Sequence, residues 1–306
     1  MRIATFRHDG RARTGIVDGD RVLPFRGDPT MLDVIVDGPG ETAEPVPLEK
    51  IRLLAPLRPA SLRDFVAFEE HVEGVRRSVD GASGVPEQWY AAPTFYFTNP
   101  HTILGPDDDV PFPATSVARD FELEVAAVIG PDQRIFGYTI FNDWSARDLQ
   151  SREMKVSLGP AKGKDFAGTL GPWIVTADEL EPVKDADGFL NLWCSAAVNG
   201  TEVGRDLLSN MGWTFDTMIA YAARDSRIVP GDVLGSGTVG NGGCLAELWG
   251  RNGRPEPPPL RDGDTVTLTV DGIGSLTNRI VSGPATAELP PVRRRDPAAA
   301  RNERQH

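Results

Sequence analysis

Two glutamates, Glu122 and Glu124, lie two residues apart in the segment 120–130, which reads DFELEVAAVIG. Apolar residues recur at every second position of this segment, and a period of two is typical of a strand, whose successive side chains point to opposite faces. The glutamates therefore point to one side of a strand that is otherwise built to be buried. Because two like charges repel and burying either is costly, either this face is exposed to solvent or a cation lies between them.

Asp143 is a third carboxylate that the chain can bring to the same place. After a turn at 130–132, residues 135–142 (IFGYTIFN) form a largely apolar run that is typical of a buried strand. The short loop between the two runs predicts a hairpin, which would bring Asp143 near the glutamates, with a helix starting at Ser145. Three carboxylates without a nearby His or Cys suit a hard cation such as Mg²⁺, Mn²⁺ or Ca²⁺ rather than zinc. The alternative interpretation of Asp143 is a helix cap.

Polar side chains on two expected helices can complete such a site. Arg147 and Gln150 follow Asp143 by four and seven residues, intervals that place all three on one helix face. A guanidinium and an amide beside a metal would bind a substrate carboxylate or enol oxygen. Upstream, Asp64 and His71 in RDFVAFEEHVEGVRR are seven residues apart, so we expect them to share a helix face as well. Each residue also has an ordinary interpretation, as a solvated surface, a structural histidine or an N-cap.

Composition excludes several classes of protein. The chain has 306 residues and is 40% hydrophobic, enough for one large domain with a small appendage. Its net charge of −12 disfavours nucleic acid or an anionic membrane as partner, although it permits a small anionic substrate. The two cysteines cannot form a disulfide framework or a cysteine zinc site. Because we find no signal peptide and no apolar run of about 18 residues, we expect a soluble cytoplasmic protein.

Turn residues divide the chain into many short strands, which indicates a mainly β protein rather than alternating βαβ units. We expect an α+β, mainly β fold with few helices, comprising a small β-rich N-terminal domain over 1–60, a catalytic domain over 61–282 and a flexible tail over 283–306. Within the catalytic domain, Asn199-Gly200 predicts a hairpin turn.

A literal GxGxxG occurs at residues 235–240 (GSGTVG) and is the fingerprint of a dinucleotide site. Such a site needs a helix immediately after the glycines, within a βαβ unit. We interpret the residues that follow, GNGGCLAELWG, as a Gly-rich segment and then a strand. The sequence therefore disfavours nucleotide binding.

Five segments together resemble the motifs of the fumarylacetoacetate hydrolase superfamily. In chain order they are RDFVAFEEH, FELEVAAVIG, GYTIFNDWSARDLQ, KGKDFAGTLGPW and GSGTVG…LAELW. The ExE followed downstream by NDWSARDLQ is the most specific, and the first 25 residues resemble the short N-terminal domain of many bacterial members. The resemblance implies a mixed β-roll catalytic domain, usually in a homodimer, that binds a divalent cation, most often Mg²⁺, and a small anionic substrate.

The resemblance also implies a role for each matching residue. The metal ligands match Glu122, Glu124 and Asp143, together with Asp64, a fourth ligand that only some branches have. The catalytic groups match His71 as general base, Glu247 as the acid that orients it, and Lys164. The groups that bind the substrate match Arg147, Gln150, Tyr96 and Thr238.

Two departures from the fumarylacetoacetase branch bear on the substrate. Val66 stands where that branch carries a tyrosine, and the loop between Thr238 and Glu247 is shorter and richer in glycine. We therefore expect metal-dependent hydrolysis of a C–C bond in a 1,3-dicarbonyl acid, acylpyruvate-like or fumarylacetoacetate-like. The alternatives are a decarboxylase or isomerase of β-keto or 2-hydroxymuconate-type acids, a 2-keto-3-deoxy sugar acid dehydratase, and a homologue that binds small molecules without turnover. Fold and metal site do not separate these reactions.

Overall fold

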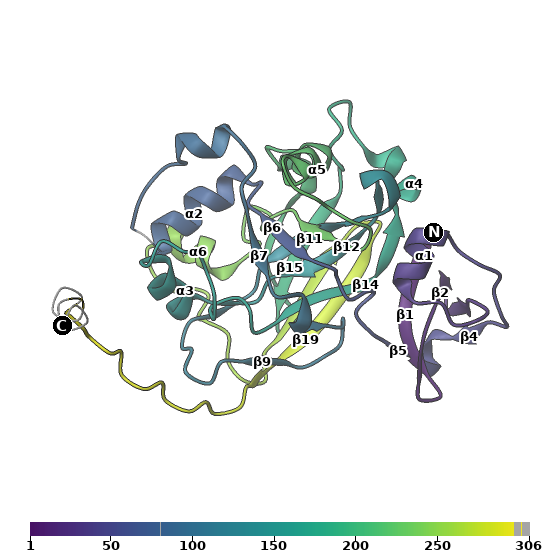
Figure 1. The fold of residues 1–306 in the computed structure, drawn as a ribbon, viewed down its shortest axis with the longest axis horizontal. Coiled ribbons are helices and arrows are strands. Elements are labelled where there is room, and N and C mark those ends of the chain that lie inside the picture. The colour runs from purple at the N-terminus through teal and green to yellow at the C-terminus, as the bar shows by residue number, and fades with distance from the viewer. Residues whose placement is uncertain (80, 297–300, 302–306) are drawn as a thin grey trace.

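The computed structural model describes residues 1–79, 81–296 and 301. They form a mainly β fold built on two mixed sheets (Figure 1), which confirms the expected fold class. The larger sheet has twelve strands, ten of them in the order β4 (Val46–Pro47), β3 (Arg21–Pro24), β2 (Arg11–Asp18), β1 (Arg2–His8), β14 (Gly168–Thr176), β12 (Ile135–Asn142), β11 (Leu123–Ile129), β17 (Val233–Gly235), β6 (Leu62–Phe65) and β7 (Phe95–Thr98). The other two are β5 (Arg52–Leu53), paired with β1, and β8 (Ile103–Leu104), paired with β14.

The second sheet has five strands and packs against the first. Its order is β16 (Thr201–Leu207), β15 (Trp193–Val198), β18 (Thr265–Val270), β19 (Gly274–Ser282) and β9 (Val110–Phe112). A separate two-stranded pair consists of β10 (Arg119–Asp120) and β13 (Ser145–Ala146). The short 3₁₀ turns are η1 (Leu48–Lys50), η2 (Glu87–Tyr90), η3 (Pro100–Thr102), η4 (Pro131–Gln133), η5 (Glu181–Val183) and η6 (Leu208–Asn210).

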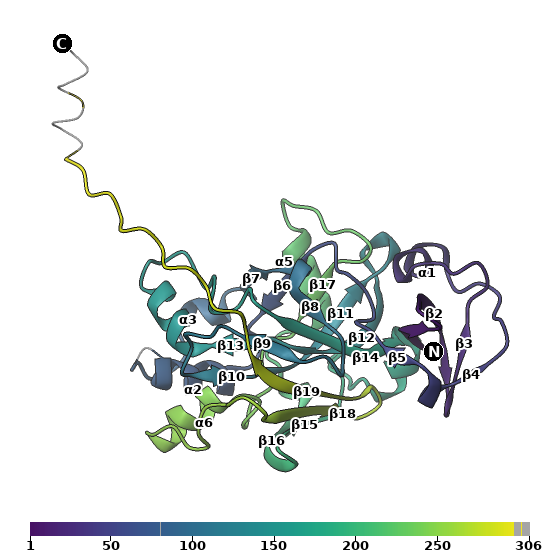
Figure 2. The same cartoon turned by 90° about the horizontal axis from the view of Figure 1, so that it is seen from below.

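The described residues form six α-helices, which flank the sheets. They are α1 (Met31–Asp37), α2 (Glu69–Val79), α3 (Arg147–Met154), α4 (Ala177–Leu180), α5 (Phe215–Ala223) and α6 (Leu245–Asn252). Helices α2, α3 and α6 gather at one end of the molecule, and α1 lies with the N-terminal strands at the other (Figures 1 and 2). Among the described residues no helix is both long and apolar enough to cross a lipid bilayer.

Strand β11 is buried on both faces, which explains its nearly continuous apolar sequence. Val125 and Ala127 belong to the core between the two sheets, whereas Ala126 and Val128 pack in a second core under α1. Glu124 shares the face of Ala126 and Val128, because side chains alternate along a strand. The carboxylate of Glu124 is therefore buried without any exposed face to solvate it.

The expected hairpin of β11 and β12 is confirmed. The two strands pair in antiparallel register with Leu123 opposite Asn142, so Asp143 follows directly at the end that holds Glu122. The helix expected from Ser145 begins two residues later, at Arg147, because Ser145 and Ala146 form strand β13 instead. The Asn199-Gly200 turn is also confirmed, with both residues at positive φ, as a two-residue hairpin turn requires.

The N-terminal strands extend the larger sheet. Strand β1 pairs with β14, with Ile3 opposite Ile174, and a turn at Gly19 and Asp20 joins β2 to β3. At the other end of the chain, residues 283–296 leave the body without forming a helix or strand (Figure 2). The rest of the predicted flexible tail falls on 297–300 and 302–306, outside the described residues, apart from residue 301.

Three expectations for local structure are wrong. Asp143 neither shares a helix face with Arg147 and Gln150 nor caps their helix, because α3 begins only at Arg147 and the strand β13 lies between them. Asp64 and His71 do not share a helix face, because Asp64 lies in strand β6 and α2 begins only at Glu69. Residues 62–65 form a strand because β6 pairs with β17 on one side and with β7 on the other. The spacing of residues within the segment gives no sign of this pairing. The LAELWG segment is helix α6 rather than a strand. Its first turn is stabilised by a distant residue, because the Asp120 carboxylate accepts hydrogen bonds from the backbone of Leu245 and Ala246.

Candidate active site

A cavity of about 400 Å³ opens where β6, β7 and the start of β11 meet helices α2 and α3. Its walls contain all the predicted site residues except Asp143 and Glu247, which lie behind them. The predicted residues that line it are Asp64, His71, Tyr96, Glu122, Glu124, Arg147, Gln150, Lys164 and Thr238. Side chains predicted from six separate segments thus meet around one space.

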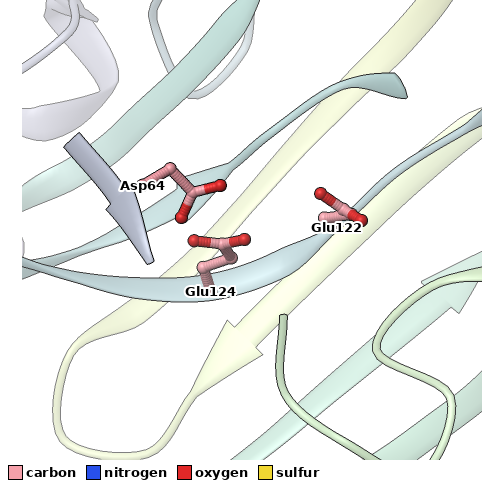
Figure 3. A group of neighbouring side chains, drawn as sticks. All are labelled: Asp64, Glu122 and Glu124. Atoms are coloured by element: carbon pink, nitrogen blue, oxygen red, sulfur yellow. The ribbon is translucent and has the colours of Figure 1, made fainter. Parts of the chain in front are cut away.

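Three of the acids form a cluster. Carboxylate oxygens of Asp64, Glu122 and Glu124 all lie within 4.8 Å of one another, and all three residues are buried. The carboxylates of Asp64 and Glu124 point toward each other, and Glu122 projects from the same side of its strand (Figure 3). Asp143 does not belong to this cluster but is joined to it by Lys164, whose ammonium contacts both Glu122 and Asp143. Asp64, which only some branches of the resembling family would use, is therefore better placed for a metal than Asp143.

The donors of this cluster suit a hard divalent cation. Asp64 Oδ1 is buried and has no hydrogen-bond partner in the described part of the chain. Burial and the charge of Asp143 raise the pKa of Asp64 well above its usual value, and burial and Asp64 do the same for the pKa of Glu124. Gly235 keeps the space open, because a Cβ there would lie 2.7 Å from Asp64 Oδ1 and 2.8 Å from Glu124 Oε2. Carboxylate oxygens are the ligands that Mg²⁺ or Mn²⁺ prefers.

Glu122 differs from the other two acids because it already has two cationic partners. Arg147 Nη2 donates to its Oε1 over 2.7 Å, and Lys164 donates to its Oε2. Burial opposes ionisation of Glu122, but the charges of Arg147 and Lys164 outweigh it and lower its pKa. Lys164 also donates to Asp143 Oδ2 over 2.6 Å, and the Tyr96 hydroxyl donates to the same oxygen over 2.5 Å. Lys164 thus keeps its charge and donates hydrogen bonds from two of its three N–H groups to carboxylates.

His71 is a buried neutral imidazole next to the acid cluster. Burial lowers its pKa to about 4, although Glu122 acts in the other direction, so the ring is uncharged at neutral pH. Its Nε2 lies 3.8 Å from Glu122 Oε1. A neutral imidazole beside a cluster of acids can accept a proton, as a general base must.

Glu247, the residue expected to orient His71, lies slightly too far away for a hydrogen bond. Its Oε2 is 3.9 Å from His71 Nδ1, and its Oε1 pairs with Arg251 over 2.5 Å. Burial raises the pKa of Glu247 to about 7, although Arg251 opposes the rise. Helices α2 and α6 approach closely here because Gly74 has no side chain, and a Cβ at that position would lie 2.5 Å from Glu247 Cγ.

Two residues of the site were missed by the sequence reasoning. Asp120 is fully buried and accepts hydrogen bonds from Arg147 Nε as well as from the start of α6, so it holds the arginine and the helix together. It precedes Glu122 by two residues, and this continuation of the acidic alternation was a usable signal. Cys244 Sγ lies 3.7 Å from His71 Nδ1, nearer than Glu247. A lone cysteine beside a predicted loop offered no comparable signal.

Cys244 is expected to hold the His71 ring in one tautomer. We expect Cys244→Ala to lower kcat about fivefold, the equivalent of one hydrogen bond of about 1 kcal/mol, with KM unchanged because Cys244 does not line the cavity. Cys244→Ser keeps an acceptor and should retain most of the activity. Nitrogen NMR of His71 provides the check, since the chain has only four histidines. If both variants kept the kcat and the His71 tautomer populations of the wild type, this role of Cys244 would be contradicted.

Thr238 and Gln150 make weaker contacts at the edge of the site. Thr238 Oγ1 lies 3.5 Å from Glu124 Oε1, and Gln150 Oε1 accepts a hydrogen bond from Arg147 Nη1 over 3.1 Å. The backbone N–H of Gly237, within the GxGxxG segment, donates to Glu124 Oε2. A carboxylate thus occupies the backbone donor that a phosphate would need. This carboxylate argues against nucleotide binding, although a helix does follow the segment.

The mixed β fold and this cavity of acids, cations and one neutral histidine define a metal-dependent enzyme as the class of protein. Residues 61–281 match the fumarylacetoacetate (FAA) hydrolase C-terminal family, and residues 1–56 match the Rv2993c-like N-terminal family. The chain belongs to the fumarylacetoacetate hydrolase family.

Named relatives and solved structures of this family perform different reactions. Fumarylacetoacetase of Arabidopsis thaliana is 30% identical over 78% of this chain and 73% of its own length. The fumarylacetoacetate hydrolase from Exiguobacterium antarcticum superposes with a TM-score of 0.71 at 26% identity, over 92% of this chain and 99% of that one. The 5-carboxymethyl-2-hydroxymuconate delta-isomerase from Mycobacterium smegmatis has a TM-score of 0.69 at 27% identity, over 92% of this chain and 100% of that one. Family membership therefore does not by itself identify the reaction.

Proposed function

We propose that the protein is a divalent-metal-dependent hydrolase that cleaves a C–C bond in a 1,3-dicarbonyl acid of the acylpyruvate type. The observation that carries this proposal is the neutral His71, which faces the acid cluster across one cavity with a charged lysine beside it. A hydrolase needs a base to activate water, whereas decarboxylation does not.

Asp64, Glu122 and Glu124 would hold a divalent cation, and the chemistry of their oxygens favours Mg²⁺ or Mn²⁺. Such a cation would supply Lewis acidity toward the two carbonyl oxygens of the substrate. His71 takes a proton from water at Nε2 as the water oxygen attacks the acyl carbonyl carbon. The bond between that carbon and the central carbon then breaks, which releases a carboxylic acid and the enolate of a 2-keto acid. The proton held by His71 returns to the enolate carbon, so protons and electrons balance.

The two buried cations have separate tasks in this reaction. Lys164 lines the cavity and has one N–H group that no described carboxylate uses, so it stabilises the oxyanion and then the enolate. The guanidinium nitrogens of Arg147 donate to Asp120, Glu122 and Gln150. Arg147 therefore acts mainly by holding Glu122 in place.

Isomerisation is the second candidate, because the M. smegmatis protein named above is an isomerase and the same groups stabilise the same enolate. A substrate panel separates the two. We expect acylpyruvates to be split into two acids in the presence of Mg²⁺ or Mn²⁺, with both products seen by mass spectrometry and no turnover after chelation. A hydroxymuconate-type acid that changes its absorbance without a change in mass would show an isomerase instead, and full activity without metal would exclude both reactions.

A further inference from the structure

A second, more apolar hollow adjoins the acid-lined cavity on the far side of His71. It measures about 290 Å³ and shares with the cavity the residues Val66, His71, Val75 and Thr94. The remaining residues that line this apolar hollow are Val72, Arg76, Pro86, Gln88 and Trp89. His71 therefore stands between a polar cavity, lined by three buried carboxylates and two buried cations, and a hollow with mainly hydrocarbon walls.

Two of the polar side chains around the apolar hollow donate hydrogen bonds to backbone carbonyls. The Trp89 indole donates its N–H to the backbone carbonyl of Val66 over 2.6 Å, which leaves its ring as an apolar surface. Arg76 Nη1 donates to the backbone carbonyl of Gly84 over 2.5 Å. Gln88 and Thr94 are exposed and so lie at the rim. The two buried cations of the site, Arg147 and Lys164, line only the polar cavity.

The hollow has room for a substantial group. A cavity of about 150 Å³ in a protein core is enough to hold benzene, so 290 Å³ accommodates a phenyl ring or a chain of several carbons. At its junction with the polar cavity, Val66 offers only methyl groups. A second substrate carboxylate placed here would lose its hydration, and Arg76, the one cation among the residues that line the hollow, is only half-buried and already donates to the Gly84 carbonyl.

We propose, on the basis of the hydrolase function above, that the acyl group of the substrate is apolar and binds in this hollow. The keto-acid end then lies among the acids, Lys164 and the metal, and the scissile bond lies beside His71. The substrate class is an acylpyruvate with a straight-chain or aromatic acyl group, rather than a compound with a carboxylate at both ends.

A homologous series of substrates tests this inference on the wild-type protein. We expect kcat/KM to rise about fourfold for each methylene added between acetylpyruvate and hexanoylpyruvate, because each buried methylene contributes a similar transfer free energy. An analogue of the same length with a terminal carboxylate should be at least about tenfold poorer than hexanoylpyruvate. Cleavage of acetylpyruvate without any dependence on chain length would overturn this inference but leave the proposed function intact. If no diketo acid were cleaved, the proposed function itself would fail, and this inference with it.

A variant of the hollow adds a second, independent measurement. Val75→Asn places an amide in its wall and should lower the ratio of kcat/KM for hexanoylpyruvate to that for acetylpyruvate about tenfold. The matched control is Val36→Asn, the same change at a half-exposed valine of α1, which should leave the ratio unchanged. Arg76→Gln tests the alternative, in which Arg76 binds a second substrate carboxylate in the hollow. If the carboxylated analogue is the better substrate of the wild type and this variant removes the preference, the hollow holds an anion and the inference is wrong.

Discussion

His71→Ala is expected to lose between about 10²- and 10⁴-fold in kcat, because a general base contributes that much to the rate. Metal binding should persist, since His71 supplies none of the three clustered carboxylates. The loss is measured as the initial rate of acylpyruvate cleavage at saturating Mg²⁺. Metal binding is measured in parallel as the rise in the melting temperature when Mg²⁺ is added.

The matched control for this variant is His101→Ala. His101 is an exposed histidine in η3 and does not line the cavity, so its removal should leave kcat unchanged. A His71→Ala variant that kept wild-type turnover would remove the general-base role. A variant that lost both turnover and the metal response would indicate that the imidazole acts through the metal site instead.

Glu124→Gln is expected to have two opposite effects on stability. Without metal the variant should be more stable than the wild type, because the change removes one of two buried carboxylates that face each other and whose raised pKa values report the cost of their charges. With metal bound, the wild type should be the more stable of the two proteins. A ligand at 100 times its Kd stabilises a protein by about 2.7 kcal/mol, and the variant loses most of this gain along with its activity. Chemical denaturation with and without Mg²⁺ measures both effects.

Two further variants show whether the lost charge or the lost space in the cluster causes these effects. Glu202→Gln makes the same change at an exposed glutamate of β16 and should alter neither the stability without metal nor the stabilisation by metal. Gly235→Ala keeps every carboxylate but places a methyl group between Asp64 and Glu124, so it should weaken the metal response without the gain in stability. A metal response of wild-type size in Glu124→Gln would show that the cation binds elsewhere.

The hairpin of β11 and β12 shows how much can be predicted from local sequence. The period of two, the short turn and the apolar runs depend only on residues near one another in the chain, and each was read correctly. The same pattern marked Glu122 and Glu124 as unusual, because a buried strand rarely carries two carboxylates on one face. Family motifs then added residues from distant segments, and the structure brings all but Asp143 and Glu247 to the cavity wall.

Residues whose structure depends on distant partners were predicted poorly. The sequence around Asp64 favours a helix, yet Gly235 and Tyr96 pair with it from two other strands and make it a strand residue. The start of α6 is stabilised by Asp120, more than a hundred residues earlier, and this contact cannot be seen in the Gly-rich local sequence. Cys244 reaches His71 only because α2 and α6 cross at a glycine.

By itself the sequence determined that this protein has a buried strand with two acids on one face and a third acid at the end of the next strand. It also indicated a family in which such acids bind a metal. Only the tertiary structure decided that Asp64 completes the cluster, that Lys164 bridges Glu122 to Asp143 and that an apolar hollow continues beyond His71. The physical reason is that strand periodicity follows from the geometry of a single segment. The charge balance of a site and the shape of a cavity arise only when segments far apart in the chain pack together.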